Sequence, residues 1–179
     1  MASERTFQRP LNHVAVSVAD ISAVVPWYTR LFGFQLIGQI SHIKRADTPD
    51  AGIFSIYPPE LNEVKIAYMS TGNGVGFEVF EFVDPPAQAP TTPLSGSQFE
   101  YTRAGFFHVC VTDPDPEARA QKVVEAGGRR LGKMVKLAGG TECLYVADPW
   151  GNVVEILDTS FERLASAFAA MEELPMSSR

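Results

Sequence analysis

Cysteine is scarce in this chain: only Cys110 and Cys143 occur among its 179 residues. Two cysteines in apolar, strand-like runs exclude a disulfide framework and a cysteine-rich zinc site, and we interpret both as small buried hydrophobic residues. Long apolar runs are also missing, and none approaches the ~20 residues of a membrane span. Residues 1–10 lack the apolar core of a secretory signal peptide. These absences predict a soluble, cytoplasmic protein without a membrane partner.

Positive charge is in the minority. Lys and Arg number 15 against 21 Asp and Glu, which gives a formal net charge of −6 and a pI near 5.1. Nucleic-acid binding needs clustered Lys and Arg on a surface, so this balance argues against a nucleic-acid partner. A hydrophobic content of 45% is ordinary for a globular core. The length fits one domain or two small packed modules.

The sequence contains an internal repeat of a strand that bears a histidine. In Leu11–Val18 and again in Phe106–Thr112, a histidine lies in a run of alternating, β-branched character, which is typical of a strand. An amphipathic, helix-like stretch follows each run and ends at a glycine. Each half then closes on a second apolar strand whose glutamate comes four residues after a glycine. The repeat supplies four equivalent side chains, which are His13, Glu78, His108 and Glu155.

The hydrophobic pattern predicts the order βαβββ twice. In the first half we expect a helix between Asp20 and Gly33, and strands at residues 11–18, 34–40, 61–69 and 76–83. Residues 41–60 are less regular, although Ile53–Tyr57 is compatible with a further short strand. In the second half we expect a helix at residues 115–126, and strands at residues 105–112, 130–136, 141–147 and 151–158.

These elements predict a single domain over residues 1–179 that is built from two modules. Module one covers residues 10–83 and module two residues 104–158. Residues 84–103 are rich in Pro, Thr, Ser and Gly, which predicts a linker that crosses over or forms a lid. Residues 160–174 form a further amphipathic helix. We expect this helix to pack on its own domain rather than to join two subunits.

The two modules differ in length. The two histidines lie 95 residues apart and the two glutamates 77, so module one is 18 residues longer between its histidine and its glutamate. That difference matches the irregular segment at residues 41–60. An insertion there leaves the strand pairing intact, because loops tolerate added length.

The four repeated side chains have the chemistry of a divalent-metal site. Imidazoles and carboxylates together suit Zn, Ni, Co, Fe or Mn better than Mg or Ca. Small residues two positions after each histidine, Ala15 and Cys110, leave room for a ligand. Glu155 lies in an apolar run, where a charge without a partner would be costly. A lone histidine in a strand is usually a hydrogen-bonded structural residue, but four side chains at equivalent places favour joint metal binding.

Glu81 competes with Glu78 for the position of fourth ligand. The two lie three positions apart on one strand and therefore point to opposite faces. The repeat register favours Glu78, so we expect Glu81 to be exposed or to face a helix. The third histidine, His42, lies in the irregular segment, and we expect it in a solvated loop.

Four motifs within residues 10–158 are specific enough to indicate a family. They are Asn12-His-Val-Ala-Val-Ser-Val-Ala-Asp20, Trp27-Tyr28 through Leu31-Phe-Gly-Phe34, Phe107-His-Val-Cys-Val111, and Asp148-Pro-Trp-Gly-Asn-Val-Val-Glu155. In these motifs the chain resembles the vicinal oxygen chelate superfamily, which includes glyoxalase I, methylmalonyl-CoA epimerase, extradiol dioxygenases, and fosfomycin- and bleomycin-resistance proteins. The resemblance implies an α+β fold. Two βαβββ modules would form a cupped, partly open mixed β-sheet barrel with flanking helices around a metal ion.

The resemblance also implies a ligand set. By position, His13, Glu78, His108 and Glu155 match the four metal ligands of glyoxalase I and related isomerases. The dioxygenase pattern has three ligands and no carboxylate at the position of Glu78. Ser17 and Phe82 stand where glyoxalase I carries an arginine and an asparagine that hold glutathione, so we do not expect glutathione dependence. Several phenylalanines near the ligands predict an aromatic pocket: Phe77, Phe80, Phe82, Phe106 and Phe107.

The function that the resemblance implies is that of a metal-dependent, glyoxalase-like isomerase, epimerase or lyase. Its substrate would be a small, fairly apolar oxygenated molecule. The metal would stabilise an enolate or enediolate, and Glu155 or Glu78 would act as the catalytic base. Two alternatives stay open: a non-haem Fe or Mn ring-cleaving dioxygenase, and a metal-free protein of this fold that binds an antibiotic or another aromatic compound. Superfamily members are commonly homodimers, and the sequence is equally compatible with a monomer whose two modules pair with each other.

Overall fold

The computed structural model describes residues 7–88, 101–102 and 104–172. The chain divides into two compact units, Met1–Ala89 and Pro90–Arg179, and each is described by itself below as module one and module two. Strand β5 extends to Asp84, and most of the segment predicted as a linker or lid, residues 89–100 and 103, lies outside the described residues.

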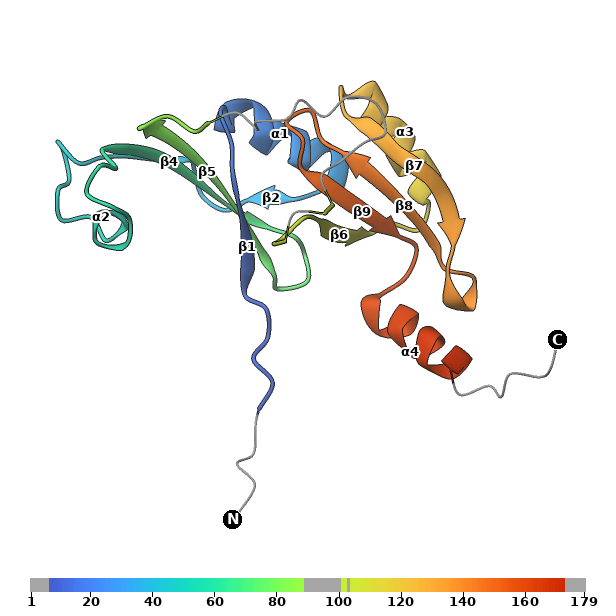
Figure 1. Cartoon of the computed structure of the whole chain (residues 1–179). Helices are drawn as coiled ribbons and strands as arrows, with labels where there is room; N and C mark the ends of the chain where they lie inside the picture. Colours follow the sequence, from blue (N-terminus) through green and yellow to red (C-terminus); the bar gives the residue numbers. More distant parts are fainter. Residues whose placement is uncertain (1–6, 89–100, 103, 173–179) are drawn as a thin grey trace, which may run out of the picture. The chain divides into compact units, whose positions relative to one another are not determined.

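Module one contains a mixed sheet, sheet one, and two helices (Figure 1). Its elements are β1 (His13–Ser17), α1 (Ile21–Phe32), β2 (Gln35–Leu36), β3 (Ser41–Lys44), α2 (Ile53–Ile56), β4 (Glu63–Ser70) and β5 (Gly76–Asp84). The strand order is β1-β5-β4-β2, and β3 also pairs with β4. Strands β1 and β5 run parallel, while the other pairs are antiparallel.

Module two repeats this plan in sheet two. Its elements are β6 (Val109–Thr112), α3 (Pro116–Glu125), β7 (Arg129–Lys136), the 3-10 helix η1 (Ala138–Gly140), β8 (Glu142–Ala147), β9 (Val153–Leu157) and α4 (Phe161–Glu172). The strand order β6-β9-β8-β7 is that of sheet one, and β6 and β9 are again the parallel pair. The α+β class and the duplicated βαβββ order are therefore confirmed.

The prediction of an irregular segment beginning at residue 41 is wrong for its first four residues. Strands β2 and β3 share β4 as a partner, and together they occupy the position that β7 occupies beside β8. The register shifts by two residues between β2 and β3, and it shifts equally within β7. A glycine with φ near +70° marks both places, Gly38 at 72° and Gly132 at 73°. The insertion of module one thus lies between β3 and β4, at residues 45–62.

Ile53–Tyr57 does not form the expected strand, since Ile53–Ile56 is a single helical turn, α2. Phe54 within it and Leu61 after it are buried against Val64 and Ile66 of β4. A short apolar run can form a strand or a buried helical turn, and here the packing of Phe54 on the sheet favours the turn. The insertion therefore covers one end of sheet one with an apolar cluster.

Helix α1 covers one face of sheet one. Asp20 caps its first turn by accepting hydrogen bonds from the N–H groups of Ser22 and Ala23, and Gly33 ends it with φ at 72°. The Tyr28 ring lies 4.8 Å from the ring of Phe77 on β5. Phe77 and Val79 are fully buried on this side, which we call the helix face. The opposite, ligand face carries the alternate residues of β5.

Helix α3 plays the same part in module two, where it packs on β7, β8 and β9. Helix α4 contributes Leu164 to a cluster with Cys143 and Leu157. Helix α4 lies within the helix predicted at residues 160–174, and Leu164 packs it on its own module. Residues 173–174 lie outside the described part. In the residues the structure covers, every helix is too short or too polar to cross a membrane.

Candidate metal centre

In module one, neighbouring strands bring His13 and Glu78 together. Strand β1 pairs with β5 so that His13 lies opposite Gly76 and Ala15 opposite Glu78. Side chains alternate along a strand, so His13, Ala15 and Glu78 share the ligand face. The His13 Nε2 atom lies 3.6 Å from Glu78 Oε2, and both side chains retain access to solvent.

Module two repeats this geometry with His108 and Glu155. Cys110 lies opposite Glu155, and His108 precedes Cys110 by two residues, just as His13 precedes Ala15. The His108 Nε2 atom lies 3.2 Å from Glu155 Oε2. The structure thus places each predicted histidine beside the predicted glutamate of its own module. The sequence pattern places His108 within a strand from residue 105, whereas β6 begins one residue after it.

The spacing within each pair suits two ligands of one metal ion. Bonds of about 2.1 Å to zinc place neighbouring ligand atoms about 3.0 Å apart in octahedral and about 3.4 Å apart in tetrahedral geometry. The observed N–O separations of 3.2 and 3.6 Å lie close to that range. Among the described residues no three or more His, Cys, Asp or Glu side chains are grouped to hold a metal. Each module by itself therefore presents two candidate ligands, one histidine and one glutamate.

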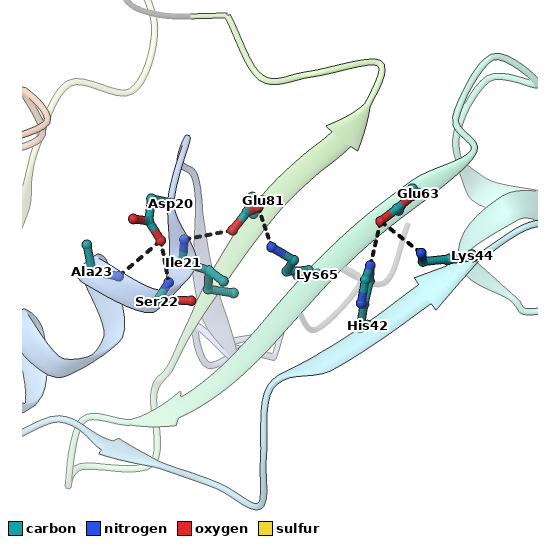
Figure 2. Close-up of polar contacts among 9 residues, drawn as sticks. All are labelled: Asp20, Ile21, Ser22, Ala23, His42, Lys44, Glu63, Lys65 and Glu81. Atoms are coloured by element: carbon teal, nitrogen blue, oxygen red, sulfur yellow. Dashed lines mark hydrogen bonds and ion pairs between the residues drawn. The ribbon is translucent and has the colours of Figure 1, made fainter.

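Glu81 has a different environment from Glu78. Its Oε2 atom accepts a hydrogen bond of 2.9 Å from the N–H of Ile21, the first residue of α1. Its Oε1 atom lies 2.7 Å from the Lys65 ammonium group (Figure 2). The carboxylate of Glu81 thus supports a helix N-terminus on the helix face, where the partial positive charge of the helix also favours it.

His42 does not lie in a solvated loop but on strand β3, which corrects the sequence-based expectation. Its Nε2 atom lies 2.6 Å from Glu63 Oε1, and Lys44 lies 3.6 Å from the same oxygen (Figure 2). The hydrogen bond with His42, aided by the charge of Lys44, holds the pKa of Glu63 below its ordinary value of 4.5. His42 pairs with Lys65, which contacts Glu81. This His–Glu pair therefore lies on the helix face, away from His13.

Glu155 is enclosed by hydrogen-bond donors. The Cys143 thiol donates to Glu155 Oε1 over 3.1 Å. Burial and the hydrogen bond to Glu155 raise the pKa of Cys143 to about 12, so the thiol is protonated and can donate at neutral pH. The phenol of Tyr145 also bonds to Glu155, and burial together with the Glu155 charge raises its pKa. Cys143 is buried as predicted, whereas Cys110, which was also predicted to be buried, is exposed.

A tyrosine lies beside each glutamate, and neither tyrosine was predicted from the sequence. Tyr68 lies opposite Glu78 in the pairing of β4 with β5, and Tyr145 lies opposite Glu155 in the pairing of β8 with β9. The two tyrosines are 77 residues apart, the same interval that separates the two glutamates. That interval could have revealed them from the sequence. Each His–Glu pair consequently has a phenol group on the neighbouring strand.

The phenylalanines divide between the two faces. Phe77 is buried under α1, which removes it from the predicted pocket. Phe80 and Phe82 follow Glu78 on the ligand face, stack with 5.8 Å between ring centroids, and contact Tyr57 of the insertion. Phe106 is exposed, and the Phe107 ring meets the imidazole of His108 edge to face at 4.4 Å.

Comparison with known sequences identifies similarity over most of the chain. The sequence profile of the Glyoxalase/Bleomycin resistance protein/Dioxygenase superfamily matches residues 10–156. A search of the curated proteins found no match.

Solved structures share the fold at low sequence identity. A glyoxalase family protein from Bacillus cereus superposes with a TM-score of 0.65 at 18% identity, over 88% of this chain and 97% of the other. A genomically encoded fosfomycin resistance protein from Listeria monocytogenes, solved with Mn(II) and sulfate, superposes with a TM-score of 0.56 at 10% identity. The match covers 87% of this chain and 97% of that one. Glyoxalase I from Zea mays gives 0.54 at 18% identity, over 84% of this chain and 44% of that one.

Proposed function

Because the chain belongs to the Glyoxalase/Bleomycin resistance protein/Dioxygenase superfamily, we propose that it is a metal-dependent isomerase, epimerase or lyase. The superfamily includes metal-dependent enzymes such as glyoxalase I and the manganese-bound fosfomycin resistance protein. The observation that carries the proposal is the pair of equivalent His–Glu contacts, one in each module.

The proposed ligands of one divalent ion are His13, Glu78, His108 and Glu155. Two imidazoles and two carboxylates suit Zn, Ni, Co, Fe or Mn. When bound, such an ion acts as a Lewis acid that lowers the energy of negative charge developing on a substrate oxygen. Glu78 separates this set from a three-ligand dioxygenase site, which is why an isomerase or lyase is the function favoured.

The glutamates supply the proton chemistry. A carboxylate oxygen of Glu78 or Glu155 would take a proton from the carbon next to the substrate carbonyl and return it to a neighbouring carbon or to the other face. The imidazoles of His13 and His108 would hold their positions throughout, because each is mounted at a strand of a rigid sheet.

The surroundings of Glu78 support a fairly apolar substrate. Phe80 and Phe82 continue the ligand face beyond Glu78, and Tyr57 of the insertion packs against both. Ser17, opposite Phe80, provides no cation for a glutathione carboxylate. We therefore propose a small oxygenated molecule with an apolar or aromatic portion as substrate, handled in the cytoplasm without nucleic-acid or membrane partners and in a monomer or homodimer.

Hydrogen exchange tests the reaction class even when the product is unidentified. Metal-loaded protein would be incubated in D2O with a panel of α-hydroxy and α-keto compounds, and loss of the C–H signal followed by proton NMR together with oxygen consumption. We expect exchange of at least one compound without oxygen uptake, abolished when Glu78→Gln and Glu155→Gln are combined. The control is Glu63→Gln, which alters the His–Glu pair on the helix face. Turnover that consumes oxygen and survives Glu78→Gln would contradict the proposal.

A further inference from the structure

The two His–Glu pairs differ in the hydrogen bonds and ring contacts that surround them. In module one the imidazole has a polar neighbour, since His13 Nδ1 lies 2.8 Å from Asn12 Oδ1. An amide oxygen can only accept, so Nδ1 of His13 must carry the proton in this contact. Nε2 then bears the lone pair, and Nε2 is the atom that faces Glu78.

In module two the imidazole lacks such a neighbour. The Nδ1 atom of His108 is buried and has no hydrogen-bond partner among the described residues. Aromatic rings enclose it instead, with Phe107 at 4.4 Å and Tyr145 at 5.4 Å, both nearly perpendicular to the imidazole. These contacts fix the plane of the ring but do not select which nitrogen carries the proton.

For the carboxylates, the module with the polar neighbour is module two rather than module one. Glu155 accepts a hydrogen bond from Cys143 on its Oε1 atom, which leaves Oε2 toward His108. The residue of module one that corresponds to Cys143 by strand pairing is Ile66, which cannot donate. Both thiols of the chain lie in module two. Glu78 therefore has no thiol to orient it.

We propose that Asn12 and Cys143 are positioning residues for the metal ligands, Asn12 by selecting the protonation site of His13 and Cys143 by fixing the rotation of Glu155. This inference rests on the proposed function. Groups that orient ligands in this way typically change metal affinity by about 10- to 100-fold when they are removed. Each module thus has one ligand oriented by a hydrogen bond, an imidazole in module one and a carboxylate in module two.

The Asn12 part is tested on metal-free protein. Nitrogen-15 NMR distinguishes the two neutral forms of a histidine ring, and we expect His13 to be held as the Nδ1–H form. In Asn12→Ala the Nε2–H form should gain population, while His42 on the helix face serves as an internal reference. A wild-type His13 that already exists mainly as the Nε2–H form would overturn this part.

The Cys143 part is tested by competition for Zn²⁺ with a chromophoric chelator. Cys143→Ala should weaken zinc binding by about 10-fold or more, and Cys143→Ser, which retains a hydroxyl donor, should recover most of that loss. Ile66→Val, at the corresponding position of module one, is the matched control and should leave the affinity unchanged. Thermal melting of each variant verifies that it is folded.

The outcomes separate this inference from the proposed function. Unchanged zinc affinity in folded Cys143→Ala would overturn the role of Cys143. Equal loss in Cys143→Ala and Cys143→Ser would do the same, because it would indicate packing rather than hydrogen bonding. Wild-type protein that holds His13 in the Nδ1–H form yet binds no zinc would instead contradict the proposed function, with the Asn12 contact itself intact.

Discussion

At the residue scale, Glu78 and Glu81 show that two carboxylates on one strand can have different surroundings. They lie three positions apart on β5 and point to opposite faces, as their spacing predicts. Glu78 faces His13, whereas Glu81 holds the first N–H of α1 and the ammonium group of Lys65. A stabilising carboxylate and a candidate metal ligand are therefore distinguishable by measurement.

Substitution of these two glutamates should have opposite consequences. Glu81→Ala leaves the N–H of Ile21 and the charge of Lys65 without their partner, so we expect it to lower the free energy of unfolding by about 1–3 kcal/mol. Metal affinity should stay unchanged. Glu78→Ala should weaken metal binding while changing stability by less. Chemical denaturation and metal titration of both variants test this, and metal loss in Glu81→Ala alone would reverse the assignment.

Glu63 should contribute to the pH dependence of stability. Its pKa is lower in the folded protein than its ordinary value of 4.5, because of the hydrogen bond with His42. A carboxyl group whose pKa is lowered by folding stabilises the folded protein at pH values above its ordinary pKa. This stabilisation is lost as the pH falls through the pKa of the folded protein. Between pH 5 and pH 3, the free energy of unfolding of Glu63→Gln, measured by chemical denaturation, should therefore depend less on pH than that of the wild type. Glu60→Gln, in an exposed turn, should follow the wild type.

At the element scale, the insertion distinguishes module one from module two. Its turn α2 buries Phe54 against the sheet and leaves Ile56 exposed. The guanidinium of Arg45 lies 4.4 Å from the centroid of the Phe54 ring. The insertion thereby adds its own small core at the end of the ligand face where Phe80 and Phe82 lie.

Replacing the side chain at two positions of α2 with alanine measures how much the insertion contributes to stability. Phe54→Ala should lower the free energy of unfolding by about 3 kcal/mol, because it creates a cavity in the cluster and removes the partner of Arg45. Ile56→Ala is the matched control, and since its side chain is 78% exposed it should change stability by no more than about 0.5 kcal/mol. Equal effects of the two substitutions would show that the insertion does not pack on the sheet as described.

Elements could be predicted from sequence where the pattern was long and regular. The pattern predicted α1 and its end residues Asp20 and Gly33 correctly, because capping chemistry is local. Strand β3 was missed because its four residues show little alternation, and only pairing with β4 makes them a strand. The helical turn α2 was mistaken for a strand because Ile53–Tyr57, with four apolar residues and one serine, has no clear periodicity and fits either structure.

At the scale of the whole molecule, the duplication is what connects the sequence to the proposed metal site. The sheets have the same strand order, and each histidine precedes by two residues the strand partner of its glutamate. The repeat therefore predicted both His–Glu pairs. The supporting residues Asn12 and Cys143 could not be found in this way, because they differ between the modules and act only through contacts in three dimensions.

Metal stoichiometry tests most directly whether the two pairs act as one site. Elemental analysis would be performed on protein purified without chelator or affinity metal, comparing wild type, His13→Ala, His108→Ala and the helix-face control His42→Ala. We predict about one Zn, Ni, Co, Fe or Mn ion per wild-type chain, retained in His42→Ala and lost when either His13 or His108 is replaced alone. Wild-type protein without metal after reconstitution, or full retention in His108→Ala, would contradict a shared metal site.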